Sequence, residues 1–208
     1  IRQLMNKFSS IRKDWSLIET LIEEDRRILD IGCGDAKLMR QLENNIKATT
    51  HGIEINRDLA LQAISNGFNV IHGNAENDLS QYSNNSFDYV ILSQTLQAMI
   101  RPKEILSELL RIGSKAIVSF PNFGHWRCRL NLAATGRMPV SKHLPHRWYD
   151  TPNIHLCTFI DFEALCAELK MTILQRRVVD QRHNEHSLIN LAPNLLGSYG
   201  FYHLGRTA

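Results

Sequence analysis

Two glycines and two carboxylates near the start of the chain have the types and the spacing of a ligand-binding loop. Gly32 and Gly34 directly follow a short apolar segment that begins at Ile28. Glycines between a buried strand and a helix let the backbone turn tightly and approach a ligand closely. Asp30 lies two residues before the first glycine, and Glu54 follows that glycine by 22 residues, at the end of the next apolar segment. An acid at this second position can accept hydrogen bonds from both hydroxyls of a ribose.

The loop lacks the features of the two common phosphate-binding loops. A dinucleotide fingerprint requires glycine at its sixth position, where Lys37 stands, and no Gly-Lys-Ser/Thr sequence follows. A ligand with an ammonium group and a ribose, but no phosphate, therefore suits Asp30 and Glu54 better. Because a strand, a glycine turn and a helix also occur in α/β proteins that bind nothing there, this prediction depends on the two acids.

An acid, two glycines and a second acid at the next strand end resemble the class I S-adenosylmethionine (SAM) methyltransferases. The resemblance implies that Asp30 and the loop hold the methionine part of SAM and that Glu54 holds its ribose. Asn74 stands where those enzymes usually have an acid beside the adenine, and Ala36 where they usually have a third glycine. The contacts implied for SAM or S-adenosylhomocysteine are Asp30, Gly32, Cys33, Gly34, Glu54, Ile55, Asn74, Ala75, Glu76, Ser93 and Gln94.

Some of these residues have simpler explanations. Cys33 can fill space in the loop, Glu76 can be a solvated charge, and Gln94 can cap the following helix. Alanine at position 36 is tolerable unless the backbone there needs a positive φ. The amide of Asn74 can still hydrogen-bond adenine through its oxygen or its nitrogen. The two departures from the family pattern therefore weaken the prediction of tight cofactor binding more than the prediction of the fold.

Short apolar runs alternate with helical periodicity along most of the chain. We expect helices at 10–24, 36–44, 57–65, 102–112 and 158–170, and strands at 28–31, 49–55, 68–72, 87–93, 115–120, 171–179 and 199–204. This alternation predicts a doubly wound, Rossmann-like α/β fold with a mostly parallel seven-stranded sheet, covered on both faces. Thr158 and Asp161 form a predicted capping box. We expect a single domain over residues 1–208.

The alternation stops for about 35 residues after the fifth strand, from Pro121 to Leu156. Stretches of this length without regular structure are usually functional. Residues 121–149 contain five cationic side chains and no carboxylate, whereas the whole chain has a formal net charge of +3. We therefore expect this insertion to face an anionic partner, although it is too short and too mildly charged to indicate nucleic acid.

A second and more specific resemblance lies in the insertion and in the segment around the fourth strand. The runs 119–130, 136–142 and 148–158, together with 87–98, resemble the MetW family of methionine-biosynthesis proteins. This resemblance implies a methyltransferase-like fold and a role in methionine synthesis beside MetX, the homoserine O-acyltransferase. It does not imply a methyl acceptor.

Two functional hypotheses follow. The first is a regulatory or binding protein that couples a SAM pocket to an acyltransferase partner. The second is a methyltransferase with a small-molecule acceptor, for which His125 and Tyr149 are candidates for a base or a substrate clamp. An [ND]PP[YF] sequence is absent after the fourth strand, which argues against N-methylation of nucleic acid or protein. The simpler alternative for Trp126, Trp148 and Tyr149 is that they pack the insertion onto the sheet.

Composition excludes several other classes of protein. A chain of 208 residues that is 43% hydrophobic has enough apolar residues for a core and is not disordered. No apolar run approaches the roughly 18 residues that span a membrane, and residues 1–10 lack the core of a signal peptide. The four cysteines form no CxxC pair, which predicts reduced thiols in the cytoplasm. The histidines form no HxxxH pair, so no metal site is expected.

Overall fold

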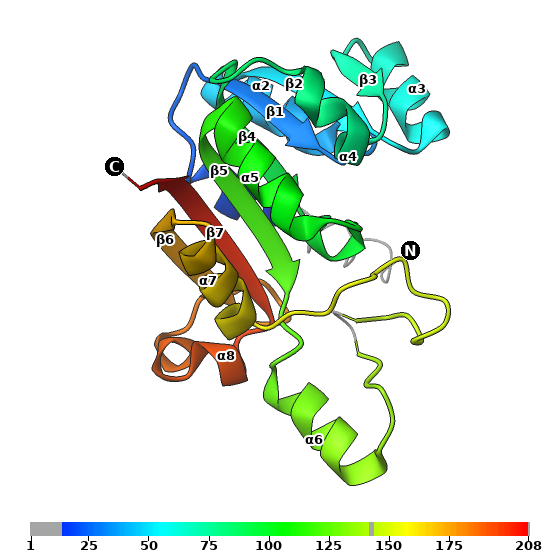
Figure 1. The fold of residues 1–208 in the computed structure, drawn as a ribbon, viewed down its shortest axis with the longest axis vertical. Helices are drawn as coiled ribbons and strands as arrows, with labels where there is room; N and C mark the ends of the chain where they lie inside the picture. Colours follow the sequence, from blue (N-terminus) through cyan, green and yellow to red (C-terminus); the bar gives the residue numbers. More distant parts are fainter. Residues whose placement is uncertain (1–13, 142–143, 208) are drawn as a thin grey trace.

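The centre of the computed structural model, which describes residues 14–141 and 144–207, is a seven-stranded sheet (Figure 1). Its strands are β1 (Arg27–Ile31), β2 (Thr49–Glu54), β3 (Val70–His72), β4 (Phe87–Ser93), β5 (Gly113–Pro121), β6 (Met171–Val179) and β7 (Tyr199–Arg206). Their order is β3-β2-β1-β4-β5-β7-β6, and β7 is antiparallel to both neighbours while the other pairs are parallel. The predicted doubly wound, mostly parallel sheet is confirmed.

Helices and short helical turns connect these strands. They are α2 (Lys37–Ile46), α3 (Arg57–Ser65), α4 (Ala75–Asp78), η1 (Leu79–Gln81), η2 (Leu96–Ala98), α5 (Pro102–Ile112), α6 (Trp126–Thr135), α7 (Phe159–Glu168), η3 (Ser187–Leu191) and α8 (Pro193–Leu196). Residues 14–19 form a further helix, which ends five residues earlier than predicted because the chain turns there towards β1. Residues 10–13 of that predicted helix lie outside the described residues. The predicted capping box of α7 is present.

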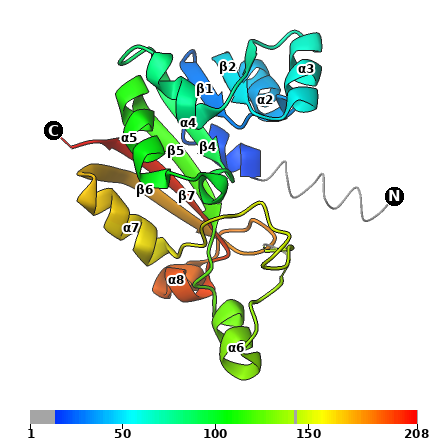
Figure 2. The ribbon, with the colours of Figure 1, turned by 45° about the vertical axis from the view of Figure 1, so that its right-hand side comes forward.

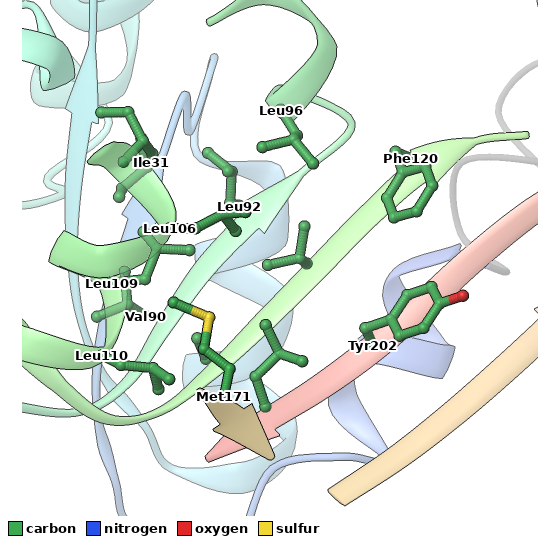
Figure 3. Packing of buried hydrophobic residues seen from close by; sticks show 14 of the residues in the cluster. Ile31, Val90, Leu92, Leu96, Leu106, Leu109, Leu110, Phe120, Met171 and Tyr202 are labelled. Carbon is green, nitrogen blue, oxygen red and sulfur yellow. The ribbon is translucent and has the colours of Figure 1, made fainter. Parts of the chain in front are cut away.

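Neighbouring residues of the central strands point to opposite faces of the sheet and divide the core in two. Tyr89 and Ile91 pack with Leu42 of α2 and with the helix at 14–19 on one face. Val90 and Leu92 pack on the other face with α5 and α7, as Figure 3 shows for part of this cluster. Burial on both faces explains why these strands are continuous apolar runs. Within the described ranges, no helix is both long and apolar enough to cross a membrane.

One edge of the sheet collects the loops that could form a site. The parallel strands β1 to β5 all end there, and the pairing of Pro121 with Tyr199 and of Tyr199 with Val179 brings the start of β7 and the end of β6 to the same edge. Open α/β sheets bind ligands at this carboxyl edge. The glycine loop and the insertion therefore lie at the same edge of the sheet, on different strands.

The insertion is not irregular throughout, and in this respect the sequence prediction was wrong. Its first part forms α6, with His125 as the N-cap and Gly136, at φ 63°, as the C-cap. Cys128 is the buried residue of this helix, whereas Leu130 and Leu132 are exposed. The apolar residues of its first two turns fall at every second position, from Trp126 to Leu132, so the sequence has no apolar stripe from which a helix could be predicted. Figures 1 and 2 show α6 projecting away from the sheet beyond the end of β5.

Candidate functional site

The glycine loop passes from β1 into α2 through three residues in the left-handed backbone region. Gly32, Gly34 and Ala36 have φ values of 75°, 58° and 62°. This conformation is free of strain for glycine, but in alanine it brings Cβ close to the following carbonyl oxygen. The condition that makes alanine tolerable at position 36 is therefore not met. Ala36 carries backbone strain of about 1 kcal/mol.

Glu54 ties this loop to the start of the helix after β2. Its Oε2 accepts a hydrogen bond from the Gly34 N–H and its Oε1 accepts one from the Asn56 N–H, each over 2.8 Å. The side chain is buried at the carboxyl end of β2, as the sequence predicts. Each carboxylate oxygen can accept a second hydrogen bond. Glu54 can therefore hold the loop and a ligand hydroxyl at the same time.

Asp30 is the second acid of the site and is 3% exposed. Burial raises the pKa of its carboxyl to about 7, and the nearby charge of Glu54 adds to this rise. Among the described residues, none donates a hydrogen bond to this side chain. A buried carboxylate without a donor is unfavourable unless a cation or a donor group joins it. The pair Asp30 and Glu54 therefore favours a ligand that brings positive charge and hydroxyl donors.

A cavity of about 210 Å³ opens beside the loop, between the ends of β1 to β4. Its lining is mostly apolar and consists of Ile31, Gly32, Ile53, Ile55, Gly73, Asn74, Ala75, Glu76, Thr95, Ala98, Met99, Ile100 and Ile154. A concave, apolar wall with a few polar groups is typical of a small-molecule site. We call this space the loop cavity. Five of the predicted contacts line it: Gly32, Ile55, Asn74, Ala75 and Glu76.

The other predicted contacts do not line the loop cavity. Asp30, Gly34 and Glu54 form the loop and its support, as described above. Cys33 packs with Met39 and Val70 in a separate small cluster, and burial raises its thiol pKa to about 12, so it fills space rather than acting as a nucleophile. Contact of any of these residues with a cofactor stays a prediction.

Ser93 and Gln94, the two predicted contacts after β4, are held by β5. The Ser93 hydroxyl hydrogen-bonds the Ser119 hydroxyl over 3.1 Å, and the Gln94 N–H donates to the Ser119 carbonyl over 2.9 Å. Gln94 has a φ of 54° and is not the cap of η2, whose N-cap is Thr95. These contacts fix the path of the chain from β4 into the wall of the loop cavity.

Asn74 and Glu76 form part of the wall of the loop cavity. Asn74 caps α4, because its Oδ1 accepts the Glu76 N–H over 3.0 Å. The side-chain NH₂ of Asn74 is then the group that can donate to a ligand. Glu76 Oε1 accepts the N–H groups of Ile100 and Arg101, each over 2.8 Å. Glu76 is therefore not merely a solvated charge, since it holds the segment that closes the cavity.

The sequence did not predict that a residue of the insertion lines the loop cavity together with the ends of the first four strands. Ile154 belongs to the insertion, and its N–H and that of His155 donate to the Gln97 carbonyl over 2.8 and 2.9 Å. These bonds bring the end of the insertion over the loop cavity, beside Met99 and Ile100. The sequence carries no local pattern for this contact, because Gln97 and Ile154 are distant along the chain.

His125 and Tyr149 are not brought to the loop cavity. His125 is buried at the start of α6, where its Nδ1 accepts the Arg127 N–H over 3.3 Å, and burial, followed by the charge of Arg127, lowers its pKa. Tyr149 is exposed and its hydroxyl accepts a hydrogen bond from Arg147 over 2.7 Å. Trp148 is 73% exposed, so it does not pack the insertion onto the sheet. Lys142 and His143 lie outside the described residues.

No group of three potential metal ligands occurs among the residues that the structure describes.

The family model for methionine biosynthesis protein MetW matches residues 12–204. The chain belongs to the MetW family. A curated relative, the bifunctional methionine biosynthesis protein MetXA/MetW of Rhodopirellula baltica, is 31% identical over 173 residues. The match covers 79% of this chain but 28% of that protein, so this MetW-family chain spans little more than a quarter of its relative's length.

Solved structures of other proteins have the same fold. An S-adenosylmethionine dependent methyltransferase from Mesorhizobium loti has a TM-score of 0.67 at 14% identity, over 93% of this chain and 98% of that one. The [4+2]-cyclase SpnF has a TM-score of 0.66 at 17% identity, over 96% of this chain and 82% of that one. The class I methyltransferase fold of this MetW-family chain is thereby confirmed. Because one of these neighbours is named as a cyclase, the fold alone does not assign methyl transfer.

Proposed function

We propose that this MetW-family chain binds S-adenosylmethionine and S-adenosylhomocysteine beside the glycine loop and acts with a homoserine O-acyltransferase in methionine synthesis. The observation that carries the first part is the buried Asp30 carboxylate, which has no hydrogen-bond donor among the described residues and lies next to Glu54. An ammonium group and two ribose hydroxyls are what these two acids require. The residues present therefore fit this cofactor.

Each part of the site has a task in this proposal. Asp30 and the loop hold the amino-acid end of the cofactor, and the free lone pairs of Glu54 accept the ribose hydroxyls. The apolar side chain of Ile55 and the NH₂ of Asn74 hold the adenine. SAM, when bound, supplies an activated methyl group. In a sensing role, its level would report the supply of methionine, so that binding would regulate the partner enzyme by feedback.

Calorimetry with SAM and with S-adenosylhomocysteine tests the cofactor part. We expect both to bind, because neither the acids nor the apolar wall requires the methyl group. Folded protein that gives no heat with either compound would remove this part of the proposal. The folded state is checked in the same sample by its thermal unfolding transition.

The partner part rests on the fused relative and on the exposed side chains of the insertion. The R. baltica protein is named as a bifunctional methionine biosynthesis protein, MetXA/MetW. In this chain Trp148, Tyr149 and Arg147 lie together at the surface of the insertion, where Trp148 and Tyr149 meet edge to face with ring centroids 5.6 Å apart. Trp, Tyr and Arg are the residues enriched at interface hot spots. Their exposure makes the insertion the surface that we assign to the acyltransferase.

Co-purification with a homoserine O-acyltransferase, and acylation rates with and without this chain, test the partner part. Trp148→Ala should weaken the association by about 2 kcal/mol, or about 30-fold. The matched control is Leu191→Ala, an apolar side chain of η3 that is 81% exposed and does not belong to the insertion. No co-elution and identical acylation rates would leave the chain without this role.

The second candidate is a methyltransferase with a small-molecule acceptor. The observation that favours it is the loop cavity on a class I methyltransferase fold, although His125 does not line that cavity. Formation of S-adenosylhomocysteine from SAM in the presence of a small-molecule acceptor would support this candidate over the regulatory one.

A further inference from the structure

A second cavity, of about 380 Å³, lies where β5 and β6 end and β7 begins. It is lined by His125, Trp126, Arg127, Asp180, Gln181, Arg182, Leu196 and Ser198. The Asn122 N–H donates to the Ser198 carbonyl over 2.8 Å, which joins the base of α6 to the start of β7. Within residues 14–141 and 144–207, this second cavity and the loop cavity have no lining residue in common. It is therefore a separate feature of the carboxyl edge.

The helix that begins at this second cavity has its charges in the unfavourable order. The first turn of α6, which is fully described, contains no acid but carries Arg127, and Arg129 follows. The positive end of a helix dipole favours anions and disfavours cations. The exposed Arg127 guanidinium lies 5.2 Å from the centre of the Trp126 ring, and both residues line the cavity. An anion bound here would offset the charge of Arg127 and the positive end of the helix dipole.

Ser198 provides an independent indication of a ligand in the second cavity. Its side chain is 0% exposed, and its Oγ has no hydrogen-bond partner among the described residues. Buried hydroxyl groups nearly always have a partner, because an unpaired one forfeits its bonds to water. The residue lines the cavity, which makes a ligand there the candidate partner for this hydroxyl.

Asp180 adds the opposite charge to the same wall. Burial acts to raise its pKa, but hydrogen bonds from the backbone of Asn184 and Arg182, over 2.9 and 2.7 Å, and the contact of His186 Nε2 with Oδ2 at 3.3 Å together lower it. Asp180 is therefore ionised at neutral pH. The cavity therefore offers cationic groups, Arg127 and Arg182, and one carboxylate, so that a ligand with an anionic end and a donor end can use both.

We propose that the second cavity binds a small carboxylate that also carries a hydrogen-bond donor, that is, an amino or hydroxy acid. The carboxylate of the ligand lies at the start of α6, with Arg127 and the Ser198 hydroxyl. The ammonium or hydroxyl group lies at Asp180. This inference goes beyond the proposed function, because none of these residues takes part in the loop cavity or its support.

Titration calorimetry with L-serine, acetate and glycerol tests the inference on the full chain. L-serine carries both groups, acetate has a carboxylate alone and glycerol has hydroxyls alone. We expect L-serine to bind at least about tenfold more tightly than acetate, since a hydrogen bond to a charged group is worth about that factor. Glycerol should give no heat. Equal affinity for L-serine and acetate, or no binding of L-serine, would overturn the proposal.

Two variants and a matched control locate the site. Arg127→Gln should weaken L-serine binding about tenfold, whereas Arg137→Gln, the same charge change at an exposed position after α6 that does not line the cavity, should alter it by less than about twofold. Ser198→Ala should also weaken binding while raising the melting temperature of the ligand-free protein, because it removes an unpaired buried hydroxyl. Equal losses in Arg127→Gln and Arg137→Gln, or unchanged affinity in Ser198→Ala, would show that L-serine binds elsewhere.

Discussion

The two halves of the carboxyl edge differ in how their chain segments are held together. In the half formed by β1 to β3, the decisive bonds join segments close in sequence, as between Glu54 and Gly34, 20 residues apart. In the half formed by β5 to β7, Asn122 donates to the carbonyls of Asn194 and Gly197, 72 and 75 residues away. The first half can be predicted from spacing, whereas the second exists only once the last strands have assembled.

Removing Asn122 should have the largest effect on stability, and the structural change should be confined to the second half. Its side chain is fully buried, makes the two bonds above and also accepts the Gly124 N–H over 2.8 Å. Asn122→Ala leaves these groups unpaired, so we expect the free energy of unfolding to fall by about 3 kcal/mol. Chemical denaturation measures this loss. SAM affinity, measured below the denaturation midpoint, should change little.

The control for this variant is Asn190→Ala, an exposed asparagine in η3. It should change stability by less than about 0.5 kcal/mol. If Asn122→Ala weakened SAM binding as strongly as it weakened the fold, the two halves would be coupled and the contrast between them would fail.

Glu54→Ala should have the largest effect on the first half. It removes the acceptor for the Gly34 and Asn56 N–H groups and for the ligand hydroxyls. Two hydrogen bonds to a charged group are worth about 3 kcal/mol or more, so we expect SAM affinity to fall at least about 100-fold. Asp58→Ala, an exposed acid four residues further on, is the control. Unchanged affinity in Glu54→Ala would mean that the ribose is not held here.

Binding of SAM should depend on pH through Asp30, whose pKa burial raises to about 7. Below pH 7 the ligand-free protein carries a proton on Asp30, and a cationic ligand must displace it. Affinity should therefore fall as the pH is lowered, approaching about tenfold per pH unit, and binding should release a proton. Calorimetry in buffers of different ionisation enthalpy measures this release.

Asp30→Asn keeps the shape of the side chain and removes its titration. This variant should bind SAM more weakly, and the pH dependence between 5.5 and 7 should disappear. A wild-type affinity that is flat over about the same interval would contradict the role given to Asp30. Ligand-free stability should show the opposite trend, because a folded pKa above the unfolded value of about 3.9 means that stability falls as the pH rises towards 7.

Substitution of Glu76 tests whether the wall of the loop cavity contributes to SAM binding as the glycine loop does. Glu76→Ala releases the N–H groups of Ile100 and Arg101, and so loosens the segment that carries Met99. We expect SAM affinity to fall by about tenfold and amide exchange to quicken at residues 98–101. Glu104→Ala, which removes an exposed partner of Arg101, is the control. Equal amide exchange in the two variants would show that Glu76 is only a solvated surface charge.

These contrasts explain how much of the molecule could be predicted from its sequence. The strands, the capping box at Thr158 and the two acids have local patterns, because pleat, helix period and loop spacing repeat over a few residues. The helix α6 has no such pattern, since its apolar residues from Trp126 to Leu132 alternate with polar ones instead of following the helix period. Ile154 reaches the loop cavity through bonds to Gln97, which only the assembled fold provides.

The smallest expected effect concerns Ala36, where the chain departs from the family pattern. Its φ of 62° and ψ of 27° lie in the left-handed region, so replacement by glycine removes strain of about 1 kcal/mol. Glycine also has more conformational freedom in the unfolded chain, which lowers the free energy of unfolding by about 0.4–1 kcal/mol. Ala36→Gly should therefore raise the free energy of unfolding by no more than about 0.6 kcal/mol. The contrasting variant is Gly34→Ala, at φ 58°. It introduces the same backbone strain and reduces the conformational freedom of the unfolded chain by the same amount. Its change in the free energy of unfolding should therefore have the opposite sign. A destabilised Ala36→Gly would mean that the buried Cβ of Ala36 contributes more through packing than its backbone loses through strain.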